Sequence, residues 1–452
     1  MLRTGLVGAA MAVLALGSVA VAGDSATLAP SPASNVSQVN SNCPVDLAGA
    51  AINPVVLADD NAPVPPAPAP AAPAAASSGP PEGAIMWGLD QIGVGKVLEK
   101  LNISITGYGE MGYFYDLTVP HNTAPARSSP PTFVLFPGDY KNQLMLNQLD
   151  LAIQRTIADP SKFDIGFMVE GFYGRDAVYT HSDGILDNGN KHGKTSPDDD
   201  LDLEQAYIDM SLPLGSGLTL TAGKFDTLLG YEVINPTGNA LYTHSYQFSY
   251  GIPFTQTGIL AAYNLTSALK LTAGITRGWN QSTDDNNGAI DFLGEAAWTI
   301  NSAWSATVNL SEGPESTGDN HDYWTVVEGI VNWNVSDQLK VAADLLYGDA
   351  NAIAQWYSAA GYASYTLNKF AAINLRGEFY HDGRGFTTGV GGSDTNYFEG
   401  TVGVAVTPTP EINLLQTLTI RPEVRIDTAD HGVFDGRKFT QLTCGIDAYL
   451  KF

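Results

Sequence analysis

The sequence predicts an all-β protein: a single closed antiparallel transmembrane β-barrel of about sixteen strands, preceded by a disordered Pro/Ala-rich segment. Three observations support this fold class. Apolar and polar residues alternate with a period of two from residue 102 onward, the connections between strands alternate in length, and the final strand ends on Phe452. The composition agrees, since 44% of the 452 residues are hydrophobic and 47 are glycines. Only alternate residues of a barrel strand face lipid, so such a composition resembles that of a soluble protein.

Three segments precede the predicted barrel. Residues 1–22 have a basic start, an apolar run and small residues up to Ala22, the layout of a signal peptide; a retained membrane anchor is the alternative. Residues 23–84 are rich in Ala, Pro and Ser, which favours a disordered periplasmic linker. Residues 85–101 predict a short helical segment with one apolar side, interrupted by glycines. The barrel itself is expected over residues 102–452.

The period-two pattern divides the barrel region into about sixteen strand-like runs separated by turn-rich segments. We expect strands near residues 102–116, 144–157, 163–174, 201–213, 217–226, 253–264, 269–279, 289–300, 303–311, 323–335, 338–348, 354–367, 370–381, 395–407, 415–427 and 438–452.

The connections between these runs alternate between short and long. Short ones include residues 158–162 and 213–217, whereas residues 118–142, 175–200 and 227–252 form long ones. Transmembrane barrels show this asymmetry, with short periplasmic turns and long external loops. An even strand number places both barrel ends in the periplasm, on the side of the short turns. A large soluble β-sandwich or β-propeller is the alternative, and no blade-like repeat supports it.

The last strand shows the two faces most clearly. An apolar set alternates with a more polar set, and the chain stops on an aromatic residue: Leu442, Cys444, Ile446, Ala448, Leu450 and Phe452 against Gln441, Thr443, Asp447, Tyr449 and Lys451. A terminal aromatic on an amphipathic strand resembles the signal by which outer-membrane barrels are inserted. We therefore expect Phe452 to be recognised by the barrel-assembly machinery.

Charge and cysteine content exclude several classes of function. The net charge of −25 argues against nucleic acid as a partner, because phosphate binding needs a basic surface. Cys43 and Cys444 are the two cysteines, too few for a disulfide framework or a Cys-based zinc site. After the N-terminus, no window of 18 uninterrupted apolar residues predicts a helical membrane span.

The motifs that could carry chemistry have simpler explanations. The G-x-G-x-x-G at Gly107, Gly109 and Gly112 lies inside a tyrosine-rich strand, so it does not predict nucleotide binding. The seven histidines fall in predicted loops or at strand ends, which indicates surface residues. Acidic clusters at 198–200 and 284–285 indicate either solvated loop charge or divalent-cation binding by oxygen ligands, and no full EF-hand-like ligand pattern surrounds them. We predict no catalytic residues, no metal site and no cofactor, and hence no enzyme.

The candidate functional residues are charged side chains on the inward faces of strands. Charges facing lipid would cost kilocalories each, so alternation turns them toward water. The predicted inward set consists of Glu110, Asp150, Glu170, Asp209, Asp344, Arg376, Glu378, Arg421, Glu423 and Arg425. Two interpretations stay open: these charges set the selectivity of a pore, or they pair along the wall and only keep the lumen polar.

The connection over residues 227–252 is rich in aromatic residues for a solvated loop. Such apolar content should be buried, and the lumen is one place to bury it. We predict that this segment folds inward and narrows the pore. Asp226 and Glu232 are then expected to face Arg376, Arg421 and Arg425 across the lumen, with a transverse field at the constriction.

Several stretches of the sequence also resemble a known family: VGKVLEKLNISITGYGEMGYFYD, LEQAYIDMSLPLGSGLTLTAGKFDTLLGYEVINPTGNALYTHSY, NLRGEFYHDGRGF and TIRPEVRID. They are similar to the OmpL-like β-barrel porin family over roughly residues 90–452. The resemblance implies a pore-forming outer-membrane protein. It brings no agreed substrate and no catalytic residues.

The sequence thus predicts an outer-membrane porin that allows passive diffusion of ions and small hydrophilic solutes through a water-filled, charge-lined lumen. The alternative is a plugged barrel that serves as a receptor, an adhesin or an envelope anchor. The expected partners are outer-membrane lipid, the solutes and the barrel-assembly machinery. The sequence does not give the oligomeric state, for which a homotrimer is the expectation by analogy with other sixteen-strand porins.

Overall fold

The computed structural model describes residues 83–118, 143–186, 200–351, 353–389, 392–412, 415–434 and 438–452. The expected signal peptide lies outside these residues. So does the expected linker, except for its last two residues.

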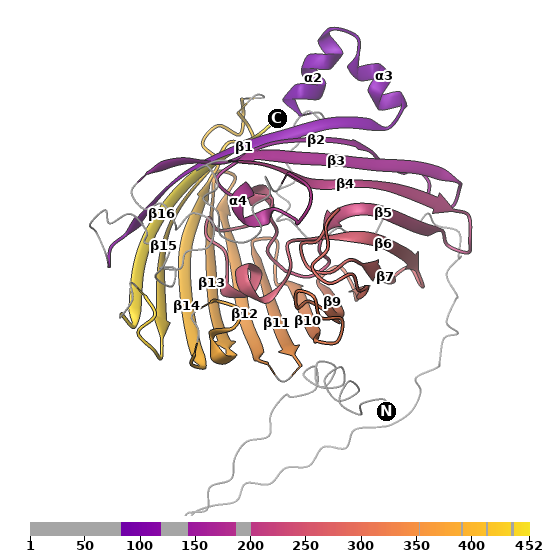
Figure 1. The fold of residues 1–452 in the computed structure, drawn as a ribbon. Coiled ribbons are helices and arrows are strands. Elements are labelled where there is room, and N and C mark those ends of the chain that lie inside the picture. Colours follow the sequence, from indigo (N-terminus) through magenta and orange to yellow (C-terminus); the bar gives the residue numbers. More distant parts are fainter. Residues whose placement is uncertain are drawn as a thin grey trace, which may run out of the picture. The chain divides into compact units, whose positions relative to one another are not determined.

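A closed barrel of sixteen antiparallel strands forms the body of the described chain (Figure 1). Each strand pairs with its neighbours in sequence, and β1 pairs with β16 to close the wall. The predicted fold class and strand number are therefore confirmed. The strands are β1 (Ile103–Asp116), β2 (Leu144–Arg155), β3 (Asp164–Gly174), β4 (Asp200–Leu212), β5 (Leu218–Asp226), β6 (Thr255–Asn264), β7 (Leu269–Thr276), β8 (Asp291–Thr299), β9 (Trp304–Pro314), β10 (Tyr323–Asn334), β11 (Leu339–Ala350), β12 (Gln355–Asn368), β13 (Ala371–Asp382), β14 (Thr395–Val406), β15 (Thr419–Ala429) and β16 (Thr440–Lys451).

Longer connections gather at one end of the barrel and short turns at the other, as the sequence predicts. Residues 265–268 and 300–303 join β6 to β7 and β8 to β9 at the short-turn end. The connections at the opposite end contain the short helices α4 (Ala177–Thr180), η3 (Pro236–Gly238), η4 (Gln247–Gly251) and η5 (Gly383–Gly385).

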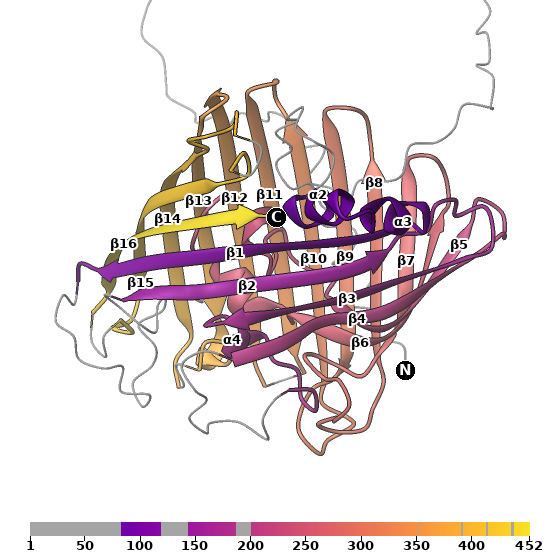
Figure 2. The ribbon, with the colours of Figure 1, turned by 90° about the horizontal axis from the view of Figure 1, so that it is seen from above.

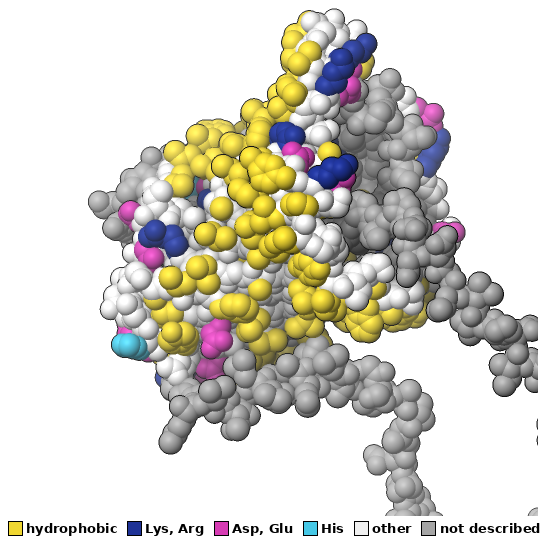
Figure 3. Space-filling model, turned by 90° about the vertical axis from the view of Figure 1, so that its right-hand side faces the viewer, with side chains coloured by type: hydrophobic (Ala, Val, Ile, Leu, Met, Phe, Trp, Pro, Cys, Tyr) yellow, Lys and Arg dark blue, Asp and Glu magenta, His cyan; other side chains and the backbone are white. Residues whose placement is uncertain are grey.

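The wall has an apolar outer face and a polar inner face. On β2, Leu149, Leu151 and Ile153 are exposed on the outside, whereas Asp150 and its inward neighbours are buried. Figure 3 shows hydrophobic side chains spread across one outer side of the wall. The pattern follows from strand geometry, in which successive side chains point to opposite faces. None of the described helices is long and apolar enough to cross a membrane.

Two short helices precede β1. The structure divides the predicted helical segment into α2 (Ala84–Gln91) and α3 (Gly95–Lys100), with a turn at Gly93, whose φ is +79°. The two helices lie outside the wall, next to β1 and the C-terminus (Figures 1 and 2). Met86 is buried there, and its Sδ accepts a hydrogen bond from the Ile105 backbone at 3.4 Å.

The main apolar cluster lies inside the barrel. It joins residues of the β5–β6 connection, such as Tyr246, Phe248 and Ile252, to wall residues that include Trp356 and Tyr380. A water-filled barrel has no apolar core of its own, so this cluster exists because a connecting segment enters the lumen.

Candidate functional site

Residues 227–254, the connection between β5 and β6, fold into the barrel; we call them the inner segment. The predicted inward fold is thus observed. The segment holds its own shape through Asn239, whose side chain hydrogen-bonds the backbone N–H and carbonyl of Val233 at 3.0 and 2.7 Å. The side chain of Asn235 caps η3 by accepting from the Thr237 N–H. These local bonds stiffen a segment that contains no strand.

Carboxylates of the wall accept hydrogen bonds from the backbone of the inner segment. Glu378 on β13 accepts from the N–H groups of Tyr246 and Gln247 at 2.6 and 2.7 Å. Glu423 on β15 accepts from Tyr242 at 2.8 Å and, more weakly, from Thr243. Glu328 on β10 and Asp344 on β11 bind the N–H groups of Gly230 and Tyr231 in the same way. Such bonds to a charged acceptor are stronger than neutral ones, so they fasten the segment to four strands.

The three predicted lumen arginines bind carbonyl groups of the same segment. Arg376 donates to the Thr243 carbonyl at 2.6 Å. Arg421 donates to the carbonyls of Pro236 and Asn239 at 2.9 and 2.7 Å. Arg425 donates to the carbonyl of His244 at 2.5 Å, and its guanidinium lies 5.3 Å from the centre of the Tyr246 ring. The wall therefore supplies both acceptors and donors to a segment whose own backbone groups would otherwise be unpaired.

Each of these arginines is also paired with carboxylates. Five carboxylate groups surround the three guanidinium groups, those of Glu110, Glu232, Glu399, Asp427 and Asp447. The closest contact of each arginine is 2.5 Å between Arg421 and Asp447, 2.6 Å between Arg376 and Glu232, and 2.7 Å between Arg425 and Asp427. All of these side chains are buried. Around the arginines, the arrangement agrees with the interpretation that the inward charges pair along the wall and keep the lumen polar.

The expected transverse field needs correction. Glu232 does not face the arginines across open space, because its Oε1 lies 2.6 Å from Nη1 of Arg376. Asp226 lies at the end of β5 and forms no ion pair with the three arginines in the described part of the chain. The reason is that the inner segment carries Glu232 across the lumen, whereas Asp226 stays in the wall.

Glycines on the inner wall make room for the inner segment. A Cβ at Gly112 would lie 2.0 Å from the Tyr242 hydroxyl, and one at Gly445 would lie 2.9 Å from the same ring. At Gly403, a Cβ would meet the Leu241 side chain at 2.6 Å. Gly112 belongs to the G-x-G-x-x-G run, which lies entirely within β1 and precedes no helix. Gly112 therefore serves close packing, and the run lacks the following helix of a phosphate-binding loop.

A second group of charges lies on β2 to β5, and we call Asp150, Glu170, Glu204 and Asp226 the acidic sector. Asp150, Glu170 and Glu204 are buried on the inner face of three adjacent strands. No described Lys or Arg forms an ion pair with any of the four. The inward Asp209 lies further along β4, where it accepts a hydrogen bond from Thr221 at 2.5 Å. The inner wall thus has one side on which arginines pair with the carboxylates, and another side on which the four carboxylates of the acidic sector form no ion pair with a described Lys or Arg.

His244 departs from the expectation that the histidines are surface residues. It is buried in the inner segment, where Nε2 lies 3.0 Å from Asn239 and 3.2 Å from the Val233 carbonyl. Its ring stacks on Phe248 at 4.3 Å. Its burial follows from the inward path of residues 227–252, which carries the ring into the lumen.

The site uses several carboxylates that are not among the predicted lumen residues. Glu204, Glu328, Glu399, Asp427 and Asp447 all belong to the inner face, as their burial shows. Asp427 and Asp447 follow the same alternation as the predicted residues, so the period-two pattern of the sequence identifies them as inward residues too. Glu204 is part of a β-bulge, which changes the alternation within β4 and hides the direction of this side chain from the sequence.

The comparisons with known proteins agree with this geometry. The family described as "Putative beta-barrel porin-2, OmpL-like" matches residues 102–452. OprB of Pseudomonas putida, in its high-pH structure, has a TM-score of 0.54 at 12% identity, covering 80% of this chain and 97% of OprB. The anion-selective porin from Comamonas acidovorans has a TM-score of 0.52 at 12% identity, covering 77% of this chain and 99% of that porin. The search against curated proteins gives no match.

At such low identity the two solved structures establish the fold, while the family match extends over the whole barrel. Fold and family indicate a channel rather than an enzyme. The resemblance to OmpL-like proteins is confirmed: the chain belongs to the OmpL-like family of β-barrel porins, and it is a porin of the outer membrane.

Proposed function

We propose that ions and small hydrophilic solutes diffuse passively through this barrel and that the inner segment forms its constriction. The observation that carries the proposal is the double attachment of the inner segment. Its N–H groups bind Glu378 and Glu423, and its carbonyls bind Arg376 and Arg421. A segment fixed in this way narrows the lumen permanently, so solute size is limited by a rigid element.

A cavity of about 280 Å³ lies beside the inner segment at the short-turn end of the barrel. Glu232 and Asn239 of the inner segment line it, together with Asn332, Lys340 and Ser364 of the wall. Amide, hydroxyl and charged groups replace the hydrogen bonds that a polar solute loses with water when it enters the lumen. An apolar solute gains nothing from them. These polar side chains support small hydrophilic molecules as the solute class, whereas apolar side chains such as Leu241, Trp304 and Val341 line the rest of the cavity.

The charge distribution supports a preference for cations. The arginines are outnumbered by the carboxylates around them, and the acidic sector adds further negative charge without a basic partner. A lumen lined by one sign of charge raises the local concentration of the opposite ion. This chain is therefore expected to differ from the Comamonas acidovorans structure, which is described as anion-selective.

Two partners remain expectations within this proposal. Phe452 directly follows β16, and its backbone N–H and carbonyl pair with Gly107 of β1 at 2.8 and 3.0 Å. A terminal aromatic at the closing seam supports recognition by the barrel-assembly machinery. The homotrimer stays an expectation by analogy with other sixteen-strand porins.

The extent of burial in the lumen supports a second candidate function. Lumen-facing groups such as Arg425, Glu328 and Tyr246 are almost inaccessible to solvent. A barrel filled further by its remaining loops would be a plugged receptor or an envelope anchor. Solute flux separates the two candidates, since a plugged barrel conducts none.

The test is swelling of liposomes that contain the purified protein, in solutions of uncharged sugars of increasing size. The expected result is fast swelling with a monosaccharide and slow swelling with a tetrasaccharide. Heat-denatured protein in the same lipid is the control. Swelling no faster than this control, with insertion of folded barrels verified, would reject the diffusion pore and favour the plugged receptor.

A further inference from the structure

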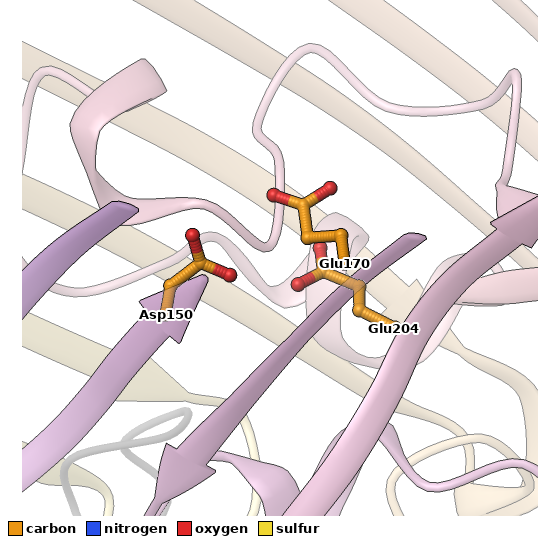
Figure 4. Close-up of side chains that lie close together, drawn as sticks. All are labelled: Asp150, Glu170 and Glu204. Carbon is orange, nitrogen blue, oxygen red and sulfur yellow. The ribbon is translucent and has the colours of Figure 1, made fainter. Parts of the chain in front are cut away.

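Three carboxylates on neighbouring strands converge within the acidic sector. Asp150 on β2, Glu170 on β3 and Glu204 on β4 each present an oxygen, and these oxygens lie within 4.8 Å of one another. Figure 4 shows the three side chains reaching from their separate strands toward a common point. Like charges at this separation repel strongly in a buried site, so something must compensate them.

A β-bulge produces this convergence. Glu170 pairs with Gln205 and Phe172 pairs with Asp202, so two residues of β4, Leu203 and Glu204, oppose a single residue of β3. The extra residue shifts the alternation of β4, and Glu204 and Gln205 both lie on the inner side. Gln205 then donates to Oε2 of Glu170 at 2.6 Å. Bulges often re-aim side chains at functional sites in this way.

The cluster is buried and incompletely bonded. Glu204 is 1% exposed and Asp150 is 3% exposed. Oε2 of Glu204 and Oδ2 of Asp150 are buried without a hydrogen-bond partner. Lys224 is the nearby cation, and it is engaged by Asp202 at 3.4 Å and by the Leu203 carbonyl. Buried carboxylate oxygens without donors are unusual in folded proteins, so these oxygens are available as ligand atoms.

The contrast with the arginine side of the lumen strengthens this conclusion. There, Arg376, Arg421 and Arg425 neutralise the buried carboxylates directly. In the described part of the chain, no Lys or Arg forms an ion pair with Asp150, Glu170 or Glu204. The same wall therefore satisfies its acids with guanidinium groups on one side and leaves them unsatisfied on the other.

We propose that Asp150, Glu170 and Glu204 bind a calcium ion in the inner wall of the barrel. Carboxylate oxygens are the ligands of hard divalent cations. Ligand oxygens on opposite sides of Ca²⁺ lie about 4.8 Å apart, twice the ordinary Ca–O distance of roughly 2.4 Å, which accommodates the observed grouping. The ion cross-links three strands and replaces their mutual repulsion with attraction. This site goes beyond passive diffusion of solutes and does not depend on it; a bound ion offsets the charge of these three carboxylates, so that Asp226 is the member of the acidic sector that keeps its charge for the cation preference.

The test is calorimetric titration of CaCl₂ into protein refolded in detergent from the denatured state, so that no lipopolysaccharide-bound calcium is carried over. Wild-type protein is expected to bind one Ca²⁺ saturably, and Ca²⁺ is expected to raise its unfolding temperature relative to EDTA. E204Q should weaken binding by about tenfold or more, because it removes one charged ligand. D209N is the matched control, since it removes the same charge from the same strand outside the cluster.

Heat-modifiable migration on gels verifies that each variant forms a closed barrel, and E170Q replaces E204Q if the latter does not fold. A loss of affinity in the cluster variant with wild-type affinity in D209N supports the site. Absence of saturable binding in the wild type would overturn it. Weak binding of several ions, reduced equally by E204Q and D209N, would also overturn the site. The ions would then be bound by other acids, such as those of the loops. None of these outcomes bears on sugar flux, so the calcium site and the diffusion pore fail independently.

Discussion

Glu232 of the inner segment and Arg376 of β13 form a buried ion pair, with 2.6 Å between Oε1 and Nη1. The two residues are far apart in sequence and meet inside the barrel. Arg376 also binds Glu399 at 3.1 Å and the Thr243 carbonyl at 2.6 Å, so one guanidinium joins the wall to the inner segment at several points. The stability of the constriction should therefore depend on this arginine.

R376M is expected to destabilise the barrel by about 3–5 kcal/mol, because it leaves Glu232 buried without its cation and Glu399 with only the more distant Arg425, 3.8 Å away. Urea unfolding in detergent, followed by tryptophan fluorescence, measures the change. R155M is the control, since Arg155 pairs with Asp164 at a partly exposed end of the wall, where a pair contributes about 1 kcal/mol or less. Equal effects of the two variants would contradict the assigned importance of Arg376.

Loss of a carboxylate acceptor should loosen the constriction without opening the barrel wall. E378Q and E423Q remove charged acceptors of backbone N–H groups, each such bond contributing about 1.5–3 kcal/mol. The expected result is noisier and larger single-channel current than in the wild type. E295Q changes a wall carboxylate on β8 that contacts Thr272 instead of the inner segment. Noise in E295Q as large as in E378Q would rule out this explanation.

The space at Gly112 gives a steric test. G112A places a methyl group 2.0 Å from the Tyr242 hydroxyl, so the inner segment must shift, at a cost of about 1–3 kcal/mol. G109A is matched, because a Cβ there meets only the Leu149 side chain at 3.7 Å. We expect lower thermal stability and altered conductance in G112A alone. If both variants behave like the wild type, Tyr242 does not pack against β1 as described.

The acidic sector should set the ion preference. In D226N the reversal potential under a salt gradient is expected to move toward zero, because negative charge is removed from the lumen wall. D159N is the control, since Asp159 lies in the exposed β2–β3 turn, where salt screens its charge. An unchanged reversal potential in D226N, or an equal shift in D159N, would show that the loops rather than the wall determine selectivity.

Much of the fold was predictable from the sequence because strand geometry is periodic. In β15, the alternation of Arg421, Glu423 and Arg425 with Pro422 and Val424 identifies the inward face without any tertiary information. The aromatic residues of the 227–252 segment likewise indicated burial, and the lumen was the available place. Both inferences depend only on local pattern and on the cost of exposing or burying side chains.

The pairing of these residues was not predictable in the same way. Alternation gives the direction of Arg376 on β13 but not its distance from Glu232, which depends on the path of a long connection. The bulge that turns Glu204 inward depends on the register between β3 and β4, and no residue in the sequence marks it. The acidic cluster of Asp150, Glu170 and Glu204 therefore emerged only from the assembled wall.

The most direct test of the central claim is single-channel conductance in a planar bilayer, compared between the wild type and a variant lacking residues 233–243. The inner segment forms the constriction in this account, so the wild type should give stable ohmic steps and the deletion should give larger ones. Closed barrels are verified for both proteins by heat-modifiable migration. Equal conductance of the two, or silence of inserted wild-type protein, would contradict the account.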